Sequence, residues 1–502
     1  MPAFSMPRAS SARVDRVLIA LGLASAAALL GVFLGRVAAS HYGPGAIEAV
    51  IGIPLLVVIA RRPGVALVVL LLVVCTVFDY GSLPRLNMPG HPPINVADLA
   101  LLAAVGGTLW RRPWRAWPVA VRRYFAVLVL FLLLASVATI KTSLLGASQA
   151  RDALFSYRNL LYLGIALTIS IELTGARWRA TLNVAIAFAG ALSILAVVAA
   201  ASPSVAHELQ LLNPTTIYSP GATNASGGVA LGNTARVRLT GLFFIYSMLL
   251  PTLVMILAVK DGWRRARIVA LLLMLAAVAL SLNRNMYVGA AVGLLVTGVL
   301  GGSLVRARIA MLITAVVLAS ALVVSSSISP AVTAEVGRRA GTIVSPSQVL
   351  QSNSAKDRSY ELSFALPAIA SHPWFGVGPR QFYGAYINGV GGTPRFYVQN
   401  LYLDFATDYG IPTALAFLLV PGVCLWFGLG RIRRMKDPFD RGILAGAIGT
   451  MVALLLSCSV DVFGQDPSTT VASGASCGFL LAAGLASSAT ATHKGALDVR
   501  QT

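Results

Sequence analysis

Apolar runs long enough to cross a lipid bilayer follow one another along almost the whole chain. A membrane-spanning helix needs about 20 mostly apolar residues, and inside lipid the backbone polar groups must be bonded within helices or closed barrels. Charged residues make up only 11% of the chain, against about a quarter of a soluble protein. The sequence therefore predicts an all-α, polytopic membrane helical bundle of about 12–14 transmembrane helices. The expected spans are residues 17–34, 46–60, 64–79, 96–110, 124–140, 154–174, 181–201, 239–259, 267–282, 287–304, 309–328, 401–428, 442–460 and 468–489.

The basic residues are concentrated in alternate connections between these runs. A net charge of +21 would indicate nucleic-acid binding in a soluble domain. If the N-terminus is cytoplasmic, however, 25 of the 39 Lys and Arg residues fall in cytoplasmic segments, where membrane proteins accumulate positive charge. We therefore expect no nucleic-acid partner, both termini in the cytoplasm, and an extracytoplasmic location for the large polar loop 329–400.

This loop is the longest polar interval of the chain, and it is expected to carry amphipathic helices. After a possible N-cap at Ser354 or Asp357, the pattern predicts a helix that lies on the membrane surface and is interrupted near Pro367. Its expected polar side carries Asp357, Arg358 and Glu361, and its expected apolar side carries Tyr360, Leu362, Ala365, Leu366 and Ile369.

The end of the loop and the start of the next span carry further polar residues. His372 lies in a Pro- and Gly-rich turn, where a structural hydrogen bond is expected rather than catalysis or metal binding. Asn400, Asp404 and Asp408 follow at a spacing of four residues, which places them on one face of the predicted helix 401–428. Acidic residues at such depth are functional candidates, and the alternative is that they pair with arginines as part of the framework.

Several arginines on the predicted outer side stand where a membrane helix does not need charge. Arg158 lies inside a span, Arg238 opens a span, and Arg284 occupies a tight turn between two apolar runs. Ionisable residues in such places are costly and usually face a cavity, and the guanidinium fork suits bidentate phosphate binding. Together with Arg358 in the loop, they form a predicted binding site for a polyprenyl diphosphate, whose headgroup lies at the membrane interface.

Short motifs in the second half of the chain resemble those of the O-antigen ligase and O-antigen polymerase superfamily of bacterial membrane glycosyltransferases. The segment His372-Pro-Trp-Phe-Gly-Val-Gly378 matches a His-Pro-x-x-Gly-x-Gly pattern in the family's large periplasmic loop. Asn400, Leu403 and Gly410 match the motif that ends this loop, but Gln399 stands where the family has a histidine. Arg238-Leu-Thr-Gly241 and Asn283-Arg284 also have counterparts, so the resemblance covers roughly residues 236–412.

The resemblance implies an enzyme of the bacterial inner membrane. Such an enzyme moves a glycan from an undecaprenyl diphosphate carrier to a hydroxyl on a lipid or glycan acceptor, without a nucleotide sugar, a metal or another cofactor. Diphosphate is a good leaving group, so catalysis needs cations where its charge develops and a base for the acceptor proton. The sequence itself also predicts no metal site, because its four cysteines and five histidines show no metal-ligand spacing.

The base is the least determined part of the predicted site. In family ligases this role belongs to the histidine, and glutamine cannot take a proton at neutral pH, so the substitution favours a polymerase or a specialised transferase over a ligase. On an ideal helix the Asn400–Asp404–Asp408 face points well over about 90° away from Gln399. We therefore predict that Asp357 or Glu361 is the base and that Gln399 positions the acceptor.

Two other functions remain open from the sequence. One is a flippase or exporter of lipid-linked glycans, which also needs cationic cavities but is favoured by inverted repeats that the sequence does not display. The other is a non-catalytic scaffold in cell-envelope assembly, with which the absent histidine agrees. The expected organisation is a membrane region 1–235, a ligase- or polymerase-like core 236–412 and a C-terminal membrane region 413–502.

Overall fold

A computed structural model describes residues 63–75, 85–86, 94–172, 177–202, 204–205, 217–219, 236–238, 241–259, 261–281, 283–302, 353–381, 398, 400–459 and 467–498. In these parts the chain is a helical membrane protein, as predicted. Six of the described helices are long and apolar enough to cross a bilayer, namely Val119–Ser143, Ser148–Glu172, Thr181–Ala199, Ile411–Ile432, Pro438–Cys458 and Pro467–Ala486. The spans expected at 17–34, 46–60 and 309–328 lie outside the described residues.

The helices follow the predicted apolar runs, with short strands in two of the connections. The strands form the antiparallel pairs β1 (Arg85–Leu86) with β2 (Ile94–Asn95) and β3 (Ile217–Ser219) with β4 (Arg236–Arg238). The helices are α3 (Pro63–Cys75), α4 (Val96–Arg111), α5 (Val119–Ser143), α6 (Ala147–Leu161), α7 (Ile165–Glu172), α8 (Arg177–Ala201), α10 (Leu242–Ala258), α11 (Arg264–Leu280), α12 (Arg284–Leu300), α16 (Asn353–Ser371), α17 (Leu401–Tyr409), α18 (Ile411–Ile432), α19 (Pro438–Cys458) and α20 (Pro467–Asp498).

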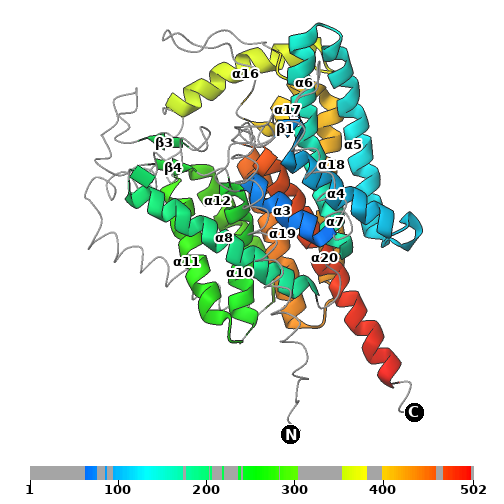
Figure 1. Ribbon diagram of the computed structural model, residues 1–502, viewed down its shortest axis with the longest axis vertical. Coiled ribbons are helices and arrows are strands. Elements are labelled where there is room, and N and C mark those ends of the chain that lie inside the picture. Colours follow the sequence, from blue (N-terminus) through cyan, green and yellow to red (C-terminus); the bar gives the residue numbers. More distant parts are fainter. Residues whose placement is uncertain are drawn as a thin grey trace, which may run out of the picture.

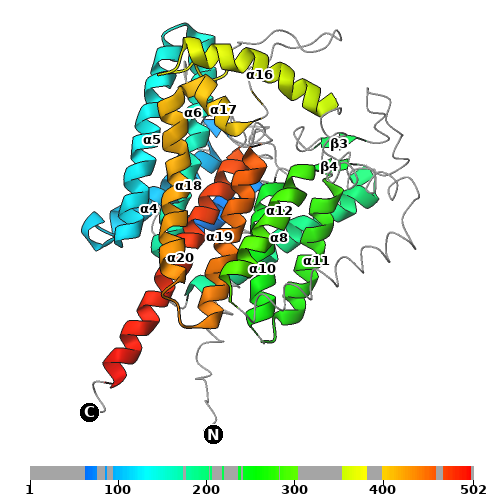
Figure 2. The same cartoon turned by 180° about the vertical axis from the view of Figure 1, so that it is seen from behind.

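The two ends of the bundle differ in what they carry (Figures 1 and 2). The helices α16 and α17 and the start of α6 lie at the upper end, where α16 runs obliquely over the bundle. The connections from α10 to α11 and from α18 to α19 lie at the lower end. These lower connections hold the basic groups Arg264, Arg265, Arg433 and Lys436. The lower end therefore carries basic residues near both of these connections, and the side of the membrane that it faces stays a prediction.

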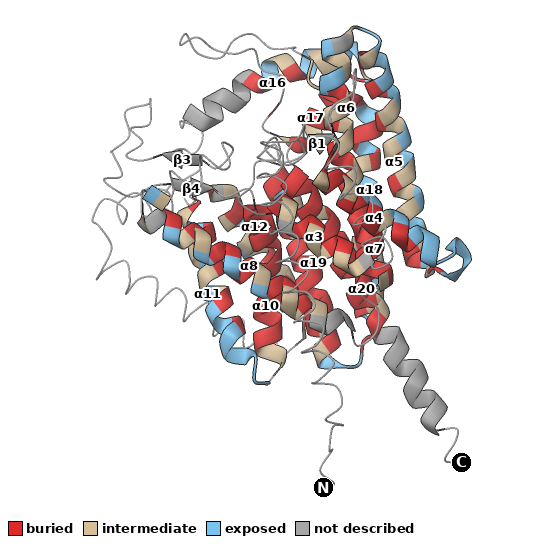
Figure 3. Ribbon diagram, in the orientation of Figure 1, coloured by how far each residue is buried: buried red, intermediate tan, exposed pale blue. Residues whose placement is uncertain are grey.

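Small residues let α12 and α19 pack closely at the centre of the bundle, where most residues are buried (Figure 3). A Cβ added to Gly293 would lie 2.6 Å from the carbonyl oxygen of Gly449, and one added to Gly449 would meet the Thr297 hydroxyl and the Gly293 carbonyl oxygen. Thr297 also donates its hydroxyl to the Gly293 carbonyl oxygen at 2.7 Å. Such close contact between helix backbones is a common source of helix association in membranes.

We expect Gly449→Ala to destabilise the bundle, because the new methyl group must push the backbones of α12 and α19 apart. Overpacking of a tight core costs about 1–3 kcal/mol. The matched control is Gly422→Ala in α18, where an added Cβ meets nothing within 4 Å. Thermal unfolding in detergent should show a lower melting temperature for the first variant only. Equal melting temperatures for both variants would contradict the assigned packing.

The span predicted at 401–428 is interrupted. The short helix α17 ends at Gly410, which has a φ of 89°, and α18 begins at Ile411 with Pro412 in its first turn. Glycine adopts this backbone conformation without steric cost, and proline is favoured at the first positions of a helix. Asp404 and Asp408 therefore belong to a separate short helix, whereas Asn400 precedes that helix in an extended conformation.

The predicted amphipathic helix is α16, with two corrections. It continues through Pro367 instead of breaking there. Proline has no N–H to bond the carbonyl of Ser363 four residues earlier. Both residues are exposed, so water can bond that carbonyl. Its covered side also differs in part from the prediction, because Glu361 is buried at 5% exposure together with Ala365, whereas Leu366 is 55% exposed. The physical reason is that α16 packs against α17, so protein contacts determine which side is covered.

Candidate functional site

The last turn of α19 forms hydrogen bonds with Tyr402 near the start of α17 and with Asn285 near the start of α12. Asn400 caps α17, since its side chain accepts hydrogen bonds from the backbone N–H groups of Tyr402 at 3.0 Å and Leu403 at 3.2 Å. The Tyr402 hydroxyl then donates to the carbonyl oxygen of Leu455 in α19 at 2.6 Å. The described role of Asn400 is therefore that of a cap, and the chain position before it, Gln399, lies outside the described residues.

The predicted arginine turn approaches the same part of α19. Arg284 is the first residue of α12, and Asn283 caps this helix by accepting the Asn285 N–H at 3.3 Å. Ser457 in the last turn of α19 donates its hydroxyl to the Asn285 carbonyl oxygen at 3.4 Å. Hydrogen bonds thus connect the first turn of α12 and, through the Tyr402 side chain, the first turn of α17 to the last turn of α19. The structure does not describe the side chain of Arg284.

Arg238 is the last residue of β4 and pairs with Ile217 of β3. This strand contacts α8 and α11, and it lies near the upper ends of these helices (Figure 2). Because Arg284 follows directly on the α11–α12 turn, the two arginines belong to the same end of the bundle. Their side-chain geometry is not described, so their joint role in binding diphosphate stays a prediction.

The Pro- and Gly-rich turn 372–380 is bonded to the C-terminal end of α17. The Val377 N–H donates to the Thr407 carbonyl oxygen at 2.8 Å, the Gly378 N–H donates to the Asp408 carbonyl oxygen at 3.1 Å, and the Ile411 N–H donates to the Pro373 carbonyl oxygen at 2.8 Å. These bonds satisfy carbonyl groups that a helix end leaves free. The His-Pro-x-x-Gly-x-Gly pattern is therefore a backbone clamp on α17.

Glycine is required in this clamp by both backbone conformation and space. Gly376 has a φ of 64°, and a Cβ at this position would collide with the backbone of Asp408. The clamp is also tied to α5, because the Lys141 ammonium donates to the Gly376 carbonyl oxygen at 2.9 Å. The His372 side chain is exposed and bonds only locally, with 2.9 Å between its Nδ1 and the Ser371 hydroxyl.

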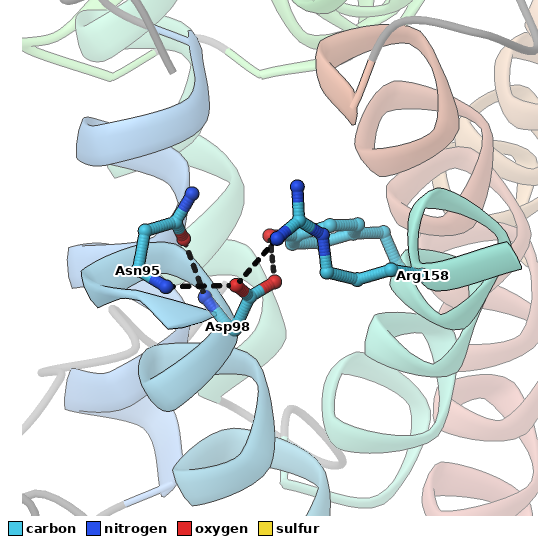
Figure 4. Close-up of polar contacts among 4 residues, drawn as sticks. Asn95, Asp98 and Arg158 are labelled. Carbon is cyan, nitrogen blue, oxygen red and sulfur yellow. Dashed lines mark hydrogen bonds and ion pairs between the residues drawn. The ribbon is translucent and has the colours of Figure 1, made fainter. Parts of the chain in front are cut away.

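Arg158 is engaged by an acidic partner that sequence reasoning missed. Its Nη1 lies 3.4 Å from Oδ2 of Asp98, and the Tyr162 hydroxyl donates to Oδ1 of Asp98 at 3.0 Å (Figure 4). Asp98 and Asn95 form a capping box at the start of α4. The Asn-x-x-Asp spacing of this box was visible in the sequence. Its contact with α6, across 60 residues of chain, was not.

A second arginine, Arg380, lies next to Arg158 around one aromatic ring. The Cζ atoms of Arg158 and Arg380 each lie 4.7 Å from the centroid of the Phe155 ring, a distance typical of cation–π contacts. The Arg380 backbone N–H donates to Oδ2 of Asp408 at 3.3 Å. Burial lowers the pKa of Arg380, and the nearby carboxyls of Asp152 and Asp408 oppose this shift. Sequence reasoning did not include Arg380 in the site.

The acidic residues of α17 are both buried. Asp404 is 5% exposed and accepts the Val398 N–H at 3.0 Å, whereas Asp408 is 3% exposed. Burial raises the pKa of Asp408, the neighbouring Asp404 raises it further, and Arg380 opposes both effects. Asp408 thus lies next to Arg380, whose guanidinium shares the Phe155 ring with Arg158.

The predicted base residues lie on α16. Glu361 is buried on the side of α16 that faces the protein. Asp357 and Arg358 are in the earlier turns of the same helix, and their side chains lie outside the description. Among the described residues, no group of three or more His, Cys, Asp or Glu side chains is close enough to hold a metal ion.

Comparison with known protein families gives one match. Residues 269–418 match the O-antigen ligase family. This range contains the Arg284 turn, α16, the clamp 372–380 and α17. No curated protein is significantly similar to the chain.

Proposed function

Residues 269–418 match the O-antigen ligase family, and from this match we propose that the chain transfers a glycan between membrane-bound substrates. The donor is a glycan on a polyprenyl diphosphate, and the acceptor is a hydroxyl of a lipid or of another glycan. The reaction takes place at the extracytoplasmic face of the bacterial inner membrane, with both termini in the cytoplasm. The membrane fold agrees with a lipid-linked substrate.

The observation that carries this proposal is that the first turns of α12 and α17 are each hydrogen-bonded to the last turn of α19. Arg284 opens α12, the Gln399–Asn400 pair precedes α17, and both helices bond to Leu455–Ser457 of α19. A cation for the leaving group and a polar group for the acceptor thus belong to segments that are bonded to the same turn of α19. Glycan transfer needs both elements next to each other.

In the proposed reaction the acceptor oxygen attacks the anomeric carbon of the donor sugar. A new carbon–oxygen bond forms while the bond to the diphosphate oxygen breaks, and polyprenyl diphosphate leaves. Arg238, Arg284 and Arg358 stabilise the charge that develops on the diphosphate. Glu361 or Asp357 accepts the proton of the acceptor hydroxyl, and Gln399 orients that hydroxyl by hydrogen bonding.

Arg158 is a less direct candidate for binding the diphosphate. Its guanidinium faces Asp98, so the proposal gives direct diphosphate contact first to the other three arginines. In the chain region that the structure describes, the carboxylate of Asp98 offsets the positive charge that Arg158 would present to a phosphate.

The proposal is tested by incubating the purified protein in lipid vesicles with a radiolabelled polyprenyl-diphosphate glycan and an acceptor glycan. We expect a longer glycan product and the release of polyprenyl diphosphate, at the same rate with and without EDTA. Loss of transfer in EDTA that magnesium restores would contradict metal independence. Movement of the intact donor across the vesicle membrane without bond formation would identify an exporter instead.

A further inference from the structure

The clamp 372–380 exposes two large apolar side chains next to each other. Trp374 is 70% exposed and Phe375 is 48% exposed. Their backbone is nevertheless closely held, because the Gly376 N–H donates to the His372 carbonyl oxygen at 3.0 Å and closes the turn around them. Single exposed apolar residues are normal on a protein surface. Two large neighbours in a closed turn indicate instead a surface that contacts an apolar partner.

Both sides of this turn are bonded to membrane helices. The Lys141 ammonium, in the last turn of α5, donates to the Gly376 carbonyl oxygen at 2.9 Å. The N–H of Ile411, the first residue of α18, donates to the Pro373 carbonyl oxygen at 2.8 Å. The helices α5 and α18 pack against each other (Figure 2). The two exposed side chains between these bonds therefore lie at the upper ends of both helices.

The helices α5 and α18 are the least buried of the spans that the structure describes. In their most apolar segments 33% and 39% of the residues are buried, the lowest shares among these six spans. Their exposed apolar residues recur at intervals of three or four positions, which places them on one face of each helix. They include Leu133, Val137 and Ile140 on α5, and Ile411, Leu415 and Leu418 on α18. In a membrane protein such a face contacts lipid chains, and on α18 it begins at the residue that is bonded to the turn.

The lengths of these two faces locate the boundary of the hydrocarbon core. On α5 the rise from Arg123, near the lower end, to Leu144 is about 31 Å, and both residues are exposed. On α18 the rise from Ile411 to Arg431, in the last turn, is about 30 Å. Both values match the thickness of about 30 Å of the hydrocarbon core. Basic residues are typical of one boundary, so the other boundary lies at the level of Leu144 and Ile411, where the turn is attached.

We propose that Trp374 and Phe375 insert into the lipid leaflet at the upper end of the bundle and anchor the clamp in the membrane interface. The partner is the bilayer, because the turn continues the lipid-facing surfaces of two adjoining helices at the end of the hydrocarbon core. Leu144 and Leu145, in the connection from α5 to α6, are also exposed and extend this surface. Tryptophan is enriched at this depth, where its ring contacts lipid and its N–H contacts water. Since the clamp is hydrogen-bonded to the end of α17, the anchor also determines the height of α17 relative to the membrane.

The depth of the turn can be measured with an environment-sensitive fluorophore on an introduced cysteine. Phe375→Cys carries the label and retains Trp374. The unmodified chain, treated in the same way, gives the background from the four native cysteines, which are buried. The protein is placed in vesicles of phosphatidylethanolamine and phosphatidylglycerol that contain a nitroxide-labelled lipid. We expect a strong loss of emission with the nitroxide near the headgroup and a weaker loss with the nitroxide near the chain end.

Two further positions calibrate this measurement. Val137→Cys lies about 10 Å below Leu144 on the lipid-facing side of α5, so it should respond most to the deep nitroxide. Ser363→Cys lies on the exposed side of α16, so it should respond to iodide in the water and to neither lipid. If Phe375→Cys responded as Ser363→Cys does, the proposal would be overturned, and the two aromatic residues would belong to a surface for a glycan or a protein.

The native indole is tested by a difference between variants. Brominated lipid should quench a smaller fraction of the tryptophan emission in Trp374→Phe than in the wild-type chain, because bromine quenches an indole only at close contact. Trp117→Phe is the control, since Trp117 is buried and its loss should not lower that fraction. An equal quenched fraction in the wild type and in Trp374→Phe would contradict the insertion. None of these measurements needs a substrate, so they remain decisive even if the chain transfers no glycan.

Discussion

Replacement of Arg284 by alanine is expected to lower the rate of glycan transfer about 10²–10³-fold, the range seen when one group that stabilises transition-state charge is removed. The same loss is expected for Arg238→Ala. Folding should be unaffected by Arg284→Ala, because Asn283 and not Arg284 caps α12. Arg284→Lys should also transfer glycan slowly, since an ammonium group is a point charge and cannot replace the bidentate guanidinium fork. Initial rates with matched protein amounts provide the measurement.

Arg265→Ala is the control for this prediction. Arg265 is an exposed arginine at the start of α11, on the helix that leads to the Arg284 turn but at its opposite end. A general effect of lost positive charge would reduce transfer in both variants, whereas a diphosphate site at the upper end predicts a loss in Arg284→Ala alone. Near-normal transfer by both Arg238→Ala and Arg284→Ala would remove the assignment of the diphosphate site.

The second large effect is expected from the loop acids. Glu361→Gln should reduce kcat about 10²–10⁴-fold if Glu361 takes the acceptor proton, because the amide has the same shape and cannot act as a base. Glu361 is buried at 5% exposure, which suits a base that works away from bulk water. Asp357→Asn, measured in parallel, decides between the two residues.

Leu362→Ala is the matched control on α16, since Leu362 is the exposed neighbour of Glu361 at 37% exposure. It should keep wild-type transfer if α16 acts through Glu361 and not through its outer surface. Wild-type rates in both acid variants would place the base elsewhere. A rate increase in Gln399→His alone would identify the chain as a ligase whose activity is reduced by the absence of the histidine.

The membrane fold was predictable because hydropathy depends on residue type alone. The run expected at 124–140 lies within α5, and the run at 442–460 largely coincides with α19. The run at 401–428 was wrongly read as one helix, since apolar residues continue on both sides of Gly410. The sequence did contain a signal for the break, because glycine followed shortly by proline marks a helix end and a helix start.

The candidate site was only partly predictable, because its charges are balanced by residues far away in the chain. Arg158 stood out as a charge inside an apolar run, but its partner Asp98 lies 60 residues earlier. Arg380 directly follows the recognised motif, and only the fold shows that it packs on Phe155. The orientation of Glu361 was missed because the pattern of α16 was interpreted against a membrane, whereas its covered side faces α17.

The clamp between residues 373–378 and 407–411 has a consequence for exchanging loops between relatives. Donors and acceptors of its backbone hydrogen bonds come from two segments separated by the tip of the loop. A chimaera with a junction inside either segment would combine a foreign turn with a native α17 and lose the match between Gly376 and the backbone of Asp408. Junctions after Arg380 and before Val398 leave both halves native. Residues 381–397 are therefore the unit to exchange between relatives.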